Sequence, residues 1–179
     1  VEFVGHPLVA PTAAARAAPE ETLPWPGEPR LALLPGSRYH EIERILPVLW
    51  LAAGRADRRL PGAGWLIAAP TAEAAGWVQA SLERLRRKPG GPARAAVTVG
   101  RTRQVLRQAR AAFVASGTAT IEAALMRCPM LVVYRTSWLT YGLGRLLIRV
   151  PYLGMVNIVA GERLCPEFIQ HRARPEPLA

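Results

Sequence analysis

Two short stretches combine glycine, hydroxyl and charged side chains in a way that suits phosphate binding. The first is Pro35-Gly36-Ser37-Arg38, which follows an apolar run and precedes a charged, helix-like segment. Gly36 lets a ligand approach the backbone, and Ser37 can cap the following helix. A cation at the positive end of a helix is unfavourable by about 0.3–1 kcal/mol, and a bound phosphate reverses that sign. Arg38 therefore indicates a phosphate contact, with a plain capped turn and a solvated arginine as the alternative.

The second stretch, SGTATIE at 116–122, repeats this arrangement before another helix-like segment. Ser116, Gly117 and Thr118 can donate hydrogen bonds to phosphate oxygens at the helix start. Glu122 lies one turn further on, where a carboxylate can accept hydrogen bonds from two vicinal hydroxyls such as those of a ribose. Glu122 could equally only complement the helix dipole. Two such helix starts in one fold favour a nucleoside diphosphate as the ligand.

Apolar runs alternate with segments of helical periodicity, which indicates a parallel sheet flanked by helices. We expect strands at 31–34, 64–71, 95–100, 111–117 and 130–135, with 156–161 as a sixth strand or extended turn. We expect helices at 12–18, 38–57, 72–87, 101–109, 118–127 and 138–149, with a last helix starting in 166–172. The prediction is an α/β, Rossmann-like fold whose ligand lies beyond the carboxyl ends of the strands, where both glycine-containing stretches lie.

Composition narrows the class of partner. The chain has 179 residues, a size typical of one domain, and a formal net charge of +10. That charge suits nucleic acid, anionic lipid or a nucleotide, unless it reflects only a compositional bias towards arginine. A nucleic-acid-binding module would need an arginine face with stacking aromatics, and aromatic residues are 7% of the chain and lie in apolar segments. Nucleic acid is therefore not an expected partner.

Several common catalytic signatures are missing from the sequence. There is no GxxxxGK[ST], no GxGxxG after a strand, no HExxH and no GxSxG. Cys128 and Cys165 have no metal-ligand spacing, so buried free thiols in a reducing compartment are expected. Because the chain does not begin with Met, we expect it to be part of a longer protein.

Several motifs, taken together and in order, resemble the C-terminal part of lipid-A-disaccharide synthases. They are GHPL, LLPGSRYHEI, VASGTATIEAAL, CPMLVVYR and VPYLGMVNIVAGERLCPEFIQ, and they extend from Val1 to about His171. The resemblance implies the C-terminal, donor-binding half of a GT-B glycosyltransferase. That family joins UDP-2,3-diacylglucosamine to 2,3-diacylglucosamine 1-phosphate and releases UDP, without a metal or other cofactor. Another UDP-sugar GT-B enzyme, an epimerase or a different glycosyltransferase, is the alternative.

The resemblance also implies the domain division and the roles of individual residues. Residues 1–29 are then an interdomain strand and linker, and residues 30–179 are the UDP-sugar-binding domain. The N-terminal acceptor domain, with its general base, lies outside this sequence, so the chain alone is expected to be inactive. The implied catalytic residues are Arg38 at the donor phosphates, Glu122 at the ribose, and Asn157 in the cleft. The implied substrate-binding residues are Gly36, Ser37, Ser116, Gly117, Thr118, Tyr134, Arg135, Glu167 and Gln170.

Acylated substrates imply a cytoplasmic enzyme that is peripheral to the inner membrane. The apolar segment 137–150, which contains Arg145 and Arg149, is too short and too charged to span a bilayer. It could lie at an anionic membrane surface or pack as a core or subunit-interface helix, which leaves a homodimer open.

Overall fold

The computed structural model describes residues 8–137, 141 and 152–179 of the chain. Six strands form one sheet, in the order β3-β2-β1-β4-β5-β6, and every neighbouring pair is parallel. The strands are β1 (Arg30–Leu34), β2 (Gly64–Ala69), β3 (Ala95–Val99), β4 (Ala111–Ala115), β5 (Met130–Tyr134) and β6 (Glu167–Ile169). This confirms the predicted α/β, Rossmann-like arrangement, and the order reverses direction between β1 and β4.

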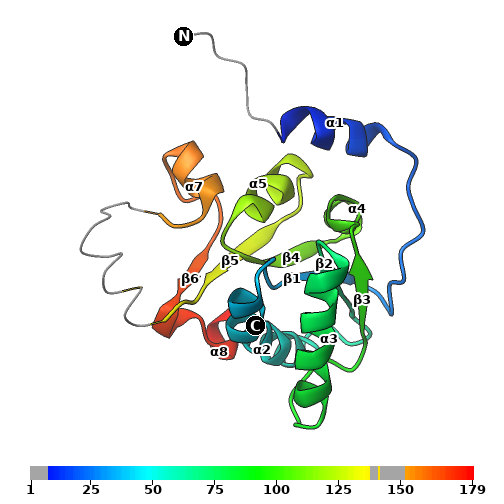
Figure 1. The fold of residues 1–179 in the computed structure, drawn as a ribbon, viewed down its shortest axis with the longest axis vertical. Helices are drawn as coiled ribbons and strands as arrows, with labels where there is room; N and C mark the ends of the chain where they lie inside the picture. The colour runs from blue at the N-terminus through cyan, green and yellow to red at the C-terminus, as the bar shows by residue number, and fades with distance from the viewer. Residues whose placement is uncertain (1–7, 138–140, 142–151) are drawn as a thin grey trace.

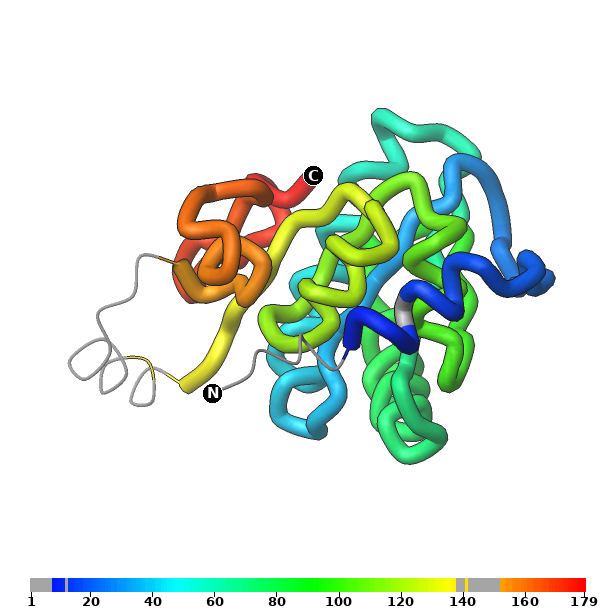
Figure 2. Tube along the Cα trace, turned by 90° about the horizontal axis from the view of Figure 1, so that it is seen from above, coloured from blue at the N-terminus to red at the C-terminus, as the bar shows by residue number. Residues whose placement is uncertain are grey.

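Helices cover both faces of this sheet (Figure 1). On one face lie α2 (Tyr39–Ala56), α3 (Ala72–Arg86) and α8 (Pro175–Leu178). On the other lie α1 (Val9–Ala17), α4 (Thr102–Gln108) and α5 (Thr118–Leu125). The remaining elements are α7 (Met155–Ala160) and a 3-10 turn, η1 (Gln170–Arg172). The C-terminal segment 152–179 lies beside β5 (Figure 2).

The central strands are continuously apolar because both of their faces are covered. In β1, Leu31 and Leu33 face the α2 side, while Ala32 and Leu34 face the α4–α5 side. All six residues of β2 are buried. The parallel register brings the ends of β1 and β4 together, because Leu34 lies opposite Val114.

The segment before β1 packs against the domain over the residues that the structure describes. Ala15 of α1 and Leu23 join the core on the α4–α5 face. The Trp25 indole donates to the Gln108 side chain at 2.8 Å. Arg107 donates to the carbonyls of Ala15 and Ala18. The division at residue 29 into linker and domain stays a prediction.

Two elements near the C-terminus differ from the sequence prediction. Residues 155–160, expected as a strand or extended turn, form α7, and residues 167–169, expected as the start of a helix, form β6 beside β5. Valine and isoleucine favour strands only weakly, and tertiary contacts to the Glu167 side chain decide the outcome here. The helix predicted at 138–149 lies outside the described residues except for Tyr141.

Both cysteines are free and buried, as predicted. Burial raises the pKa of the Cys128 thiol to about 11, and burial followed by the charge of Glu167 raises the pKa of Cys165. Both thiols are therefore poor nucleophiles at neutral pH, and a packing role is sufficient for them.

Candidate functional site

A cavity of about 350 Å³ lies where the strand order reverses, beyond the carboxyl ends of β1 and β4. The loops after these two strands form its walls, and both run directly into a helix, α2 or α5. Open parallel sheets bind ligands at this position. The cavity brings together seven of the residues predicted from sequence: Gly36, Ser37, Arg38, Ser116, Gly117, Thr118 and Glu122.

The start of α2 already holds a carboxylate. Oε2 of Glu41 accepts hydrogen bonds from the backbone N–H groups of Ser37 (3.1 Å) and Arg38 (3.4 Å). Gly36 has φ +111°, and a side chain there would also place Cβ 2.7 Å from Oε2 of Glu41. The glycine is therefore required by both the backbone and the close carboxylate. An incoming anion cannot use these N–H groups unless it displaces Glu41.

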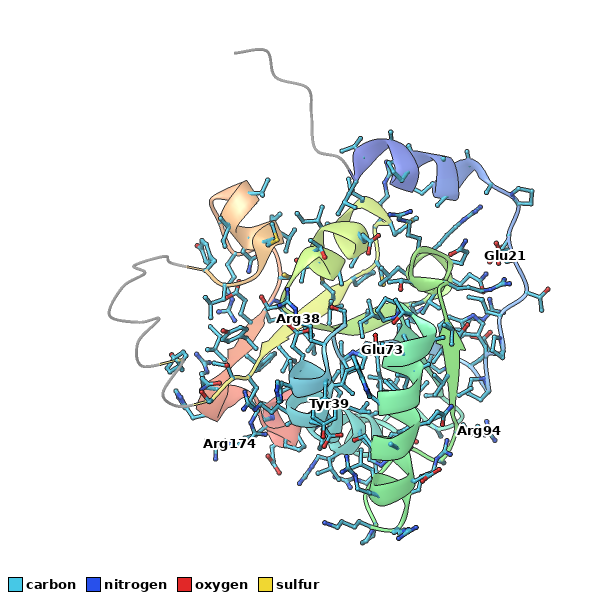
Figure 3. The ribbon with its side chains drawn as sticks, viewed as in Figure 1. Glu21, Arg38, Tyr39, Glu73, Arg94 and Arg174 are labelled. Atoms are coloured by element: carbon cyan, nitrogen blue, oxygen red, sulfur yellow. The ribbon has the colours of Figure 1, made fainter. Side chains whose placement is uncertain are left out.

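The Ser37 hydroxyl and the Arg38 side chain remain as the parts of this loop that can reach a phosphate. The Arg38 side chain is 82% exposed and makes only a long contact with Glu41, with Nη1 3.4 Å from Oε1. Figure 3 labels Arg38 near the middle of the molecule, at the start of α2 and below α5. The negative charge of Glu41 offsets the unfavourable position of a cation at a helix N-terminus.

The start of α5 is built differently, from small residues. Gly117 has φ +154° with open space around its α-carbon, and Gly117, Thr118 and Ala119 line the cavity. The Thr120 hydroxyl donates to the Gly117 carbonyl at 2.7 Å and so fixes the turn. The helix dipole and the small side chains here favour a bound anion.

Glu122 lines the cavity one turn along α5 and has a partner that sequence reasoning missed. Its Oε1 accepts a hydrogen bond from Nε of Arg103 in α4 at 2.9 Å. The Glu122 side chain is 17% exposed, so it remains open to a ligand on one side. Arg103 precedes it by 19 residues, and no local pattern could have revealed the pair.

Tyr134 and Arg135 line a second cavity of about 320 Å³ at the end of β5. Arg38, Glu41 and Ser116 line both cavities, so the two adjoin. The second cavity is also lined by His40, Glu41, Arg44 and Thr136, none of which was predicted from the sequence as a site residue.

Asn157 and Glu167 lie close to the first cavity without lining it. The Asn157 side chain is fully buried, and its Oδ1 accepts from the N–H groups of Leu164 and Cys165. Its Nδ2 donates to Oε1 of Glu167 at 2.8 Å and to the Cys165 carbonyl. The side chains of Asn157 and Glu167 therefore both form hydrogen bonds within the chain.

Glu167 in turn fixes the entry to α7. Its carboxylate accepts from the N–H groups of Leu153 (3.0 Å) and Gly154 (2.9 Å). The Leu153 carbonyl accepts a hydrogen bond from the Ser116 hydroxyl at 2.8 Å. The Asn157–Glu167 pair is therefore connected through Leu153 to the loop that begins α5. Met155, in the first turn of α7, lines the cavity.

Gln170 is buried and pairs with the backbone of Thr136. Its Oε1 accepts from the Thr136 N–H at 2.7 Å, and its Nε2 donates to the Thr136 carbonyl at 3.2 Å. Gln170 lines a third cavity together with Arg135 and holds the chain as it leaves β5.

Comparison with known proteins assigns the family. A family model described as lipid-A-disaccharide synthetase matches residues 1–179, which is the entire chain. The chain belongs to this family. The match favours the lipid-A-disaccharide synthetase family over the epimerase and other UDP-sugar alternatives that the motifs left open.

Curated relatives agree with the family match. Lipid-A-disaccharide synthase of Syntrophus aciditrophicus is 38% identical over 183 residues, covering 100% of this chain and 46% of the relative. The synthase of Neisseria meningitidis serogroup A is 39% identical over 181 residues, covering 99% of this chain and 46% of the relative. This lipid-A-disaccharide synthetase family member thus spans about half the length of the curated relatives it matches.

Among solved structures, a glycosyl transferase family 9 protein from Veillonella parvula aligns with a TM-score of 0.39 at 12% identity. The alignment covers 83% of this family member and 46% of that chain, and a likeness this slight does not bear on function. Across residues 8–137, 141 and 152–179, no group of three or more His, Cys, Asp or Glu side chains is arranged to hold a metal ion.

Proposed function

We propose that this chain is the donor-binding part of a lipid-A-disaccharide synthase of the GT-B type and binds UDP-2,3-diacylglucosamine. One observation carries the proposal: a cavity at the reversal point of the sheet presents a cation, the small residues of a helix start and the Glu122 carboxylate within one space, while the second carboxylate, Glu41, is held by the N–H groups of α2. Arg38 and the start of α5 suit a diphosphate, and Glu122 suits a ribose. The family match over the whole chain supports the same ligand.

The reaction we propose needs the remainder of the protein, because the curated relatives are about twice as long. A hydroxyl of the 2,3-diacylglucosamine 1-phosphate acceptor attacks the anomeric carbon, a new C–O bond forms with inversion, and the bond to UDP breaks. The hydroxyl proton goes to a general base outside these 179 residues. Negative charge grows on the departing diphosphate, where a preorganised donor group contributes about 3–4 kcal/mol. The Arg38 guanidinium and the α5 N-terminus supply such groups.

UDP binding without a metal is the first test. Isothermal titration calorimetry of the 179-residue chain with UDP is expected to give the same dissociation constant in EDTA and in Mg²⁺. The expectation rests on Arg38 and a helix start as the charge-balancing groups. Binding that requires a divalent metal would refute the metal-free proposal, and absence of UDP binding in both buffers would refute the donor-site assignment.

We also propose that the enzyme works at the cytoplasmic surface of the inner membrane, where its acylated substrates lie. Two observations support a surface contact: the net charge of +10, and the exposed apolar side chains Ile158, Val159 and Leu164. Among the described residues, no helix combines the length and the apolar character that crossing a bilayer requires. Each basic residue near an anionic surface contributes about 1 kcal/mol, and salt screens this attraction.

Vesicle sedimentation tests the membrane proposal. The chain is expected to bind vesicles containing phosphatidylglycerol more tightly than neutral phosphatidylcholine vesicles, and added salt should weaken the binding. Equal binding to both kinds of vesicle, or binding that salt does not change, would contradict the electrostatic argument.

A further inference from the structure

The second cavity, about 320 Å³ in volume, lies beside the nucleotide cavity. The first turns of α2 and the end of β5 form its walls, and Arg38 and Ser116 separate it from the first cavity. Its size is at the lower end for ligand pockets, which suits a small group such as a phosphate rather than a whole nucleotide.

The charge in this cavity is unbalanced. Three guanidinium groups, those of Arg38, Arg44 and Arg135, line it together with one carboxylate, that of Glu41, giving a formal balance of +2 with His40 neutral. Glu41 is already engaged by the N–H groups at the start of α2. Among the ion pairs between described residues, none involves Arg44 or Arg135.

The lining groups match the chemistry of a phosphate monoester. A guanidinium group can donate two parallel hydrogen bonds to phosphate oxygens, and Arg44 and Arg135 are exposed and so open to a ligand from solution. The Tyr134 hydroxyl adds a neutral donor. Arg38 lies between the two cavities, so its charge offsets the repulsion between two anions bound side by side.

We propose that the second cavity binds the phosphate of the sugar-phosphate acceptor while UDP or the donor occupies the first cavity. The inference rests on the proposed function, which requires a phosphosugar acceptor to meet the donor in the same cleft. This chain then contributes to acceptor recognition as well as donor binding. Fixing the acceptor through its phosphate would use binding energy remote from the reacting hydroxyl to orient that hydroxyl.

The test uses glucosamine 1-phosphate as a soluble probe of the acceptor headgroup, titrated into the chain saturated with UDP. Glucosamine 1-phosphate and inorganic phosphate are expected to bind, glucosamine is not, and UDP should leave the phosphate affinity unchanged or raised. Arg135→Gln and Arg44→Gln should each weaken glucosamine 1-phosphate binding by about tenfold, the loss expected for a charge-assisted hydrogen bond. Arg44→Gln should leave the dissociation constant of UDP within about twofold, since Arg44 does not line the nucleotide cavity.

Arg58→Gln is the matched control, because it removes the same charge from an exposed residue just past the far end of α2. It should not change glucosamine 1-phosphate binding. An equal loss in Arg58→Gln would show a general charge effect and overturn the site. Competition between phosphate and UDP would also overturn it, because both anions would then share one site.

Two further outcomes separate this inference from the proposed function. Normal UDP binding with no binding of glucosamine 1-phosphate overturns the acceptor site and leaves the donor site standing. Phosphatidylglycerol vesicles that displace glucosamine 1-phosphate, with the same dependence on Arg44 and Arg135, would reassign the cavity to lipid headgroups and overturn the acceptor assignment.

Discussion

Replacing Glu122 with Gln tests the ribose assignment directly. The substitution keeps the size of the side chain and removes the charge from the carboxylate that lines the nucleotide cavity. A hydrogen bond to a charged group contributes about 1.5–3 kcal/mol, so UDP should bind about 10- to 150-fold more weakly. Inorganic diphosphate, which has no ribose, should change by less than about twofold.

Arg103 makes this prediction sharper, because it contacts the same carboxylate. Its Nε donates to Oε1 of Glu122 at 2.9 Å, and no hydrogen bond between described residues uses Oε2. If Arg103 positions Glu122 for the ribose, Arg103→Gln should weaken UDP binding modestly. The side chains of Arg103 and Glu122 are 31% and 17% exposed, so solvent screens the ion pair and its contribution is about 0.2–1 kcal/mol. The dissociation constant of UDP should therefore rise by less than about sixfold.

The assay is calorimetry with UDP and diphosphate on the two single variants and the double variant. In the Glu122→Gln background, Arg103→Gln should have little further effect, since the pair acts through one carboxylate. Arg107→Gln is the control: it lies one turn along α4, and its side chain contacts the carbonyls of Ala15 and Ala18 instead.

Two results would refute the reasoning. Tighter UDP binding in Arg103→Gln would mean that Arg103 competes with the ribose for Glu122 rather than positioning it. Equal weakening of UDP and diphosphate in Glu122→Gln would mean that the carboxylate supports the phosphate site through the fold and does not contact the ribose.

Two further predictions concern Arg38 and Asn157. Arg38→Ala should weaken UDP and inorganic diphosphate alike in calorimetry while leaving the melting temperature nearly unchanged, because the side chain is 82% exposed; unchanged diphosphate binding would contradict a phosphate contact. Asn157→Ala should lower the free energy of unfolding in urea by about 1–3 kcal/mol, because the N–H of the buried Cys165 loses its acceptor. An unchanged urea midpoint would contradict the structural role of Asn157.

The sequence pattern predicted the first five strands because the local composition of each one favours a buried strand. Runs such as 31–34 and 64–69 are apolar at every position and end at Pro, Gly or Thr, and a segment of that kind fits only between two layers of helices. Leu33, Leu66 and Ile67 are fully buried accordingly. The same pattern predicted that the loops after β1 and β4 meet, and a cavity lies there, since loops after parallel strands collect at one edge of the sheet.

The C-terminal elements could not be predicted in this way, because side chains distant along the chain determine them. Residues 155–160 contain valine and isoleucine, which locally favour extended structure. They form a helix because Glu167 accepts the N–H groups that precede it and Asn157 holds the loop that follows it. Glu167, in turn, lies in a three-residue strand too short to leave a periodic pattern.

The two helix starts at the first cavity offer different groups to an anion, although their sequences look alike. At α2, the acid at the third helical position, Glu41, occupies the N–H groups, so that end offers a phosphate the side chains of Ser37 and Arg38 rather than its backbone. At α5, small residues leave space around Gly117 and Thr118, so that end can offer its backbone. A diphosphate should therefore rest on the start of α5 while Arg38 reaches it from α2. This arrangement is consistent with a cation, Arg38, beside the helix start in the first stretch, where the second stretch has only Thr118 and Ala119.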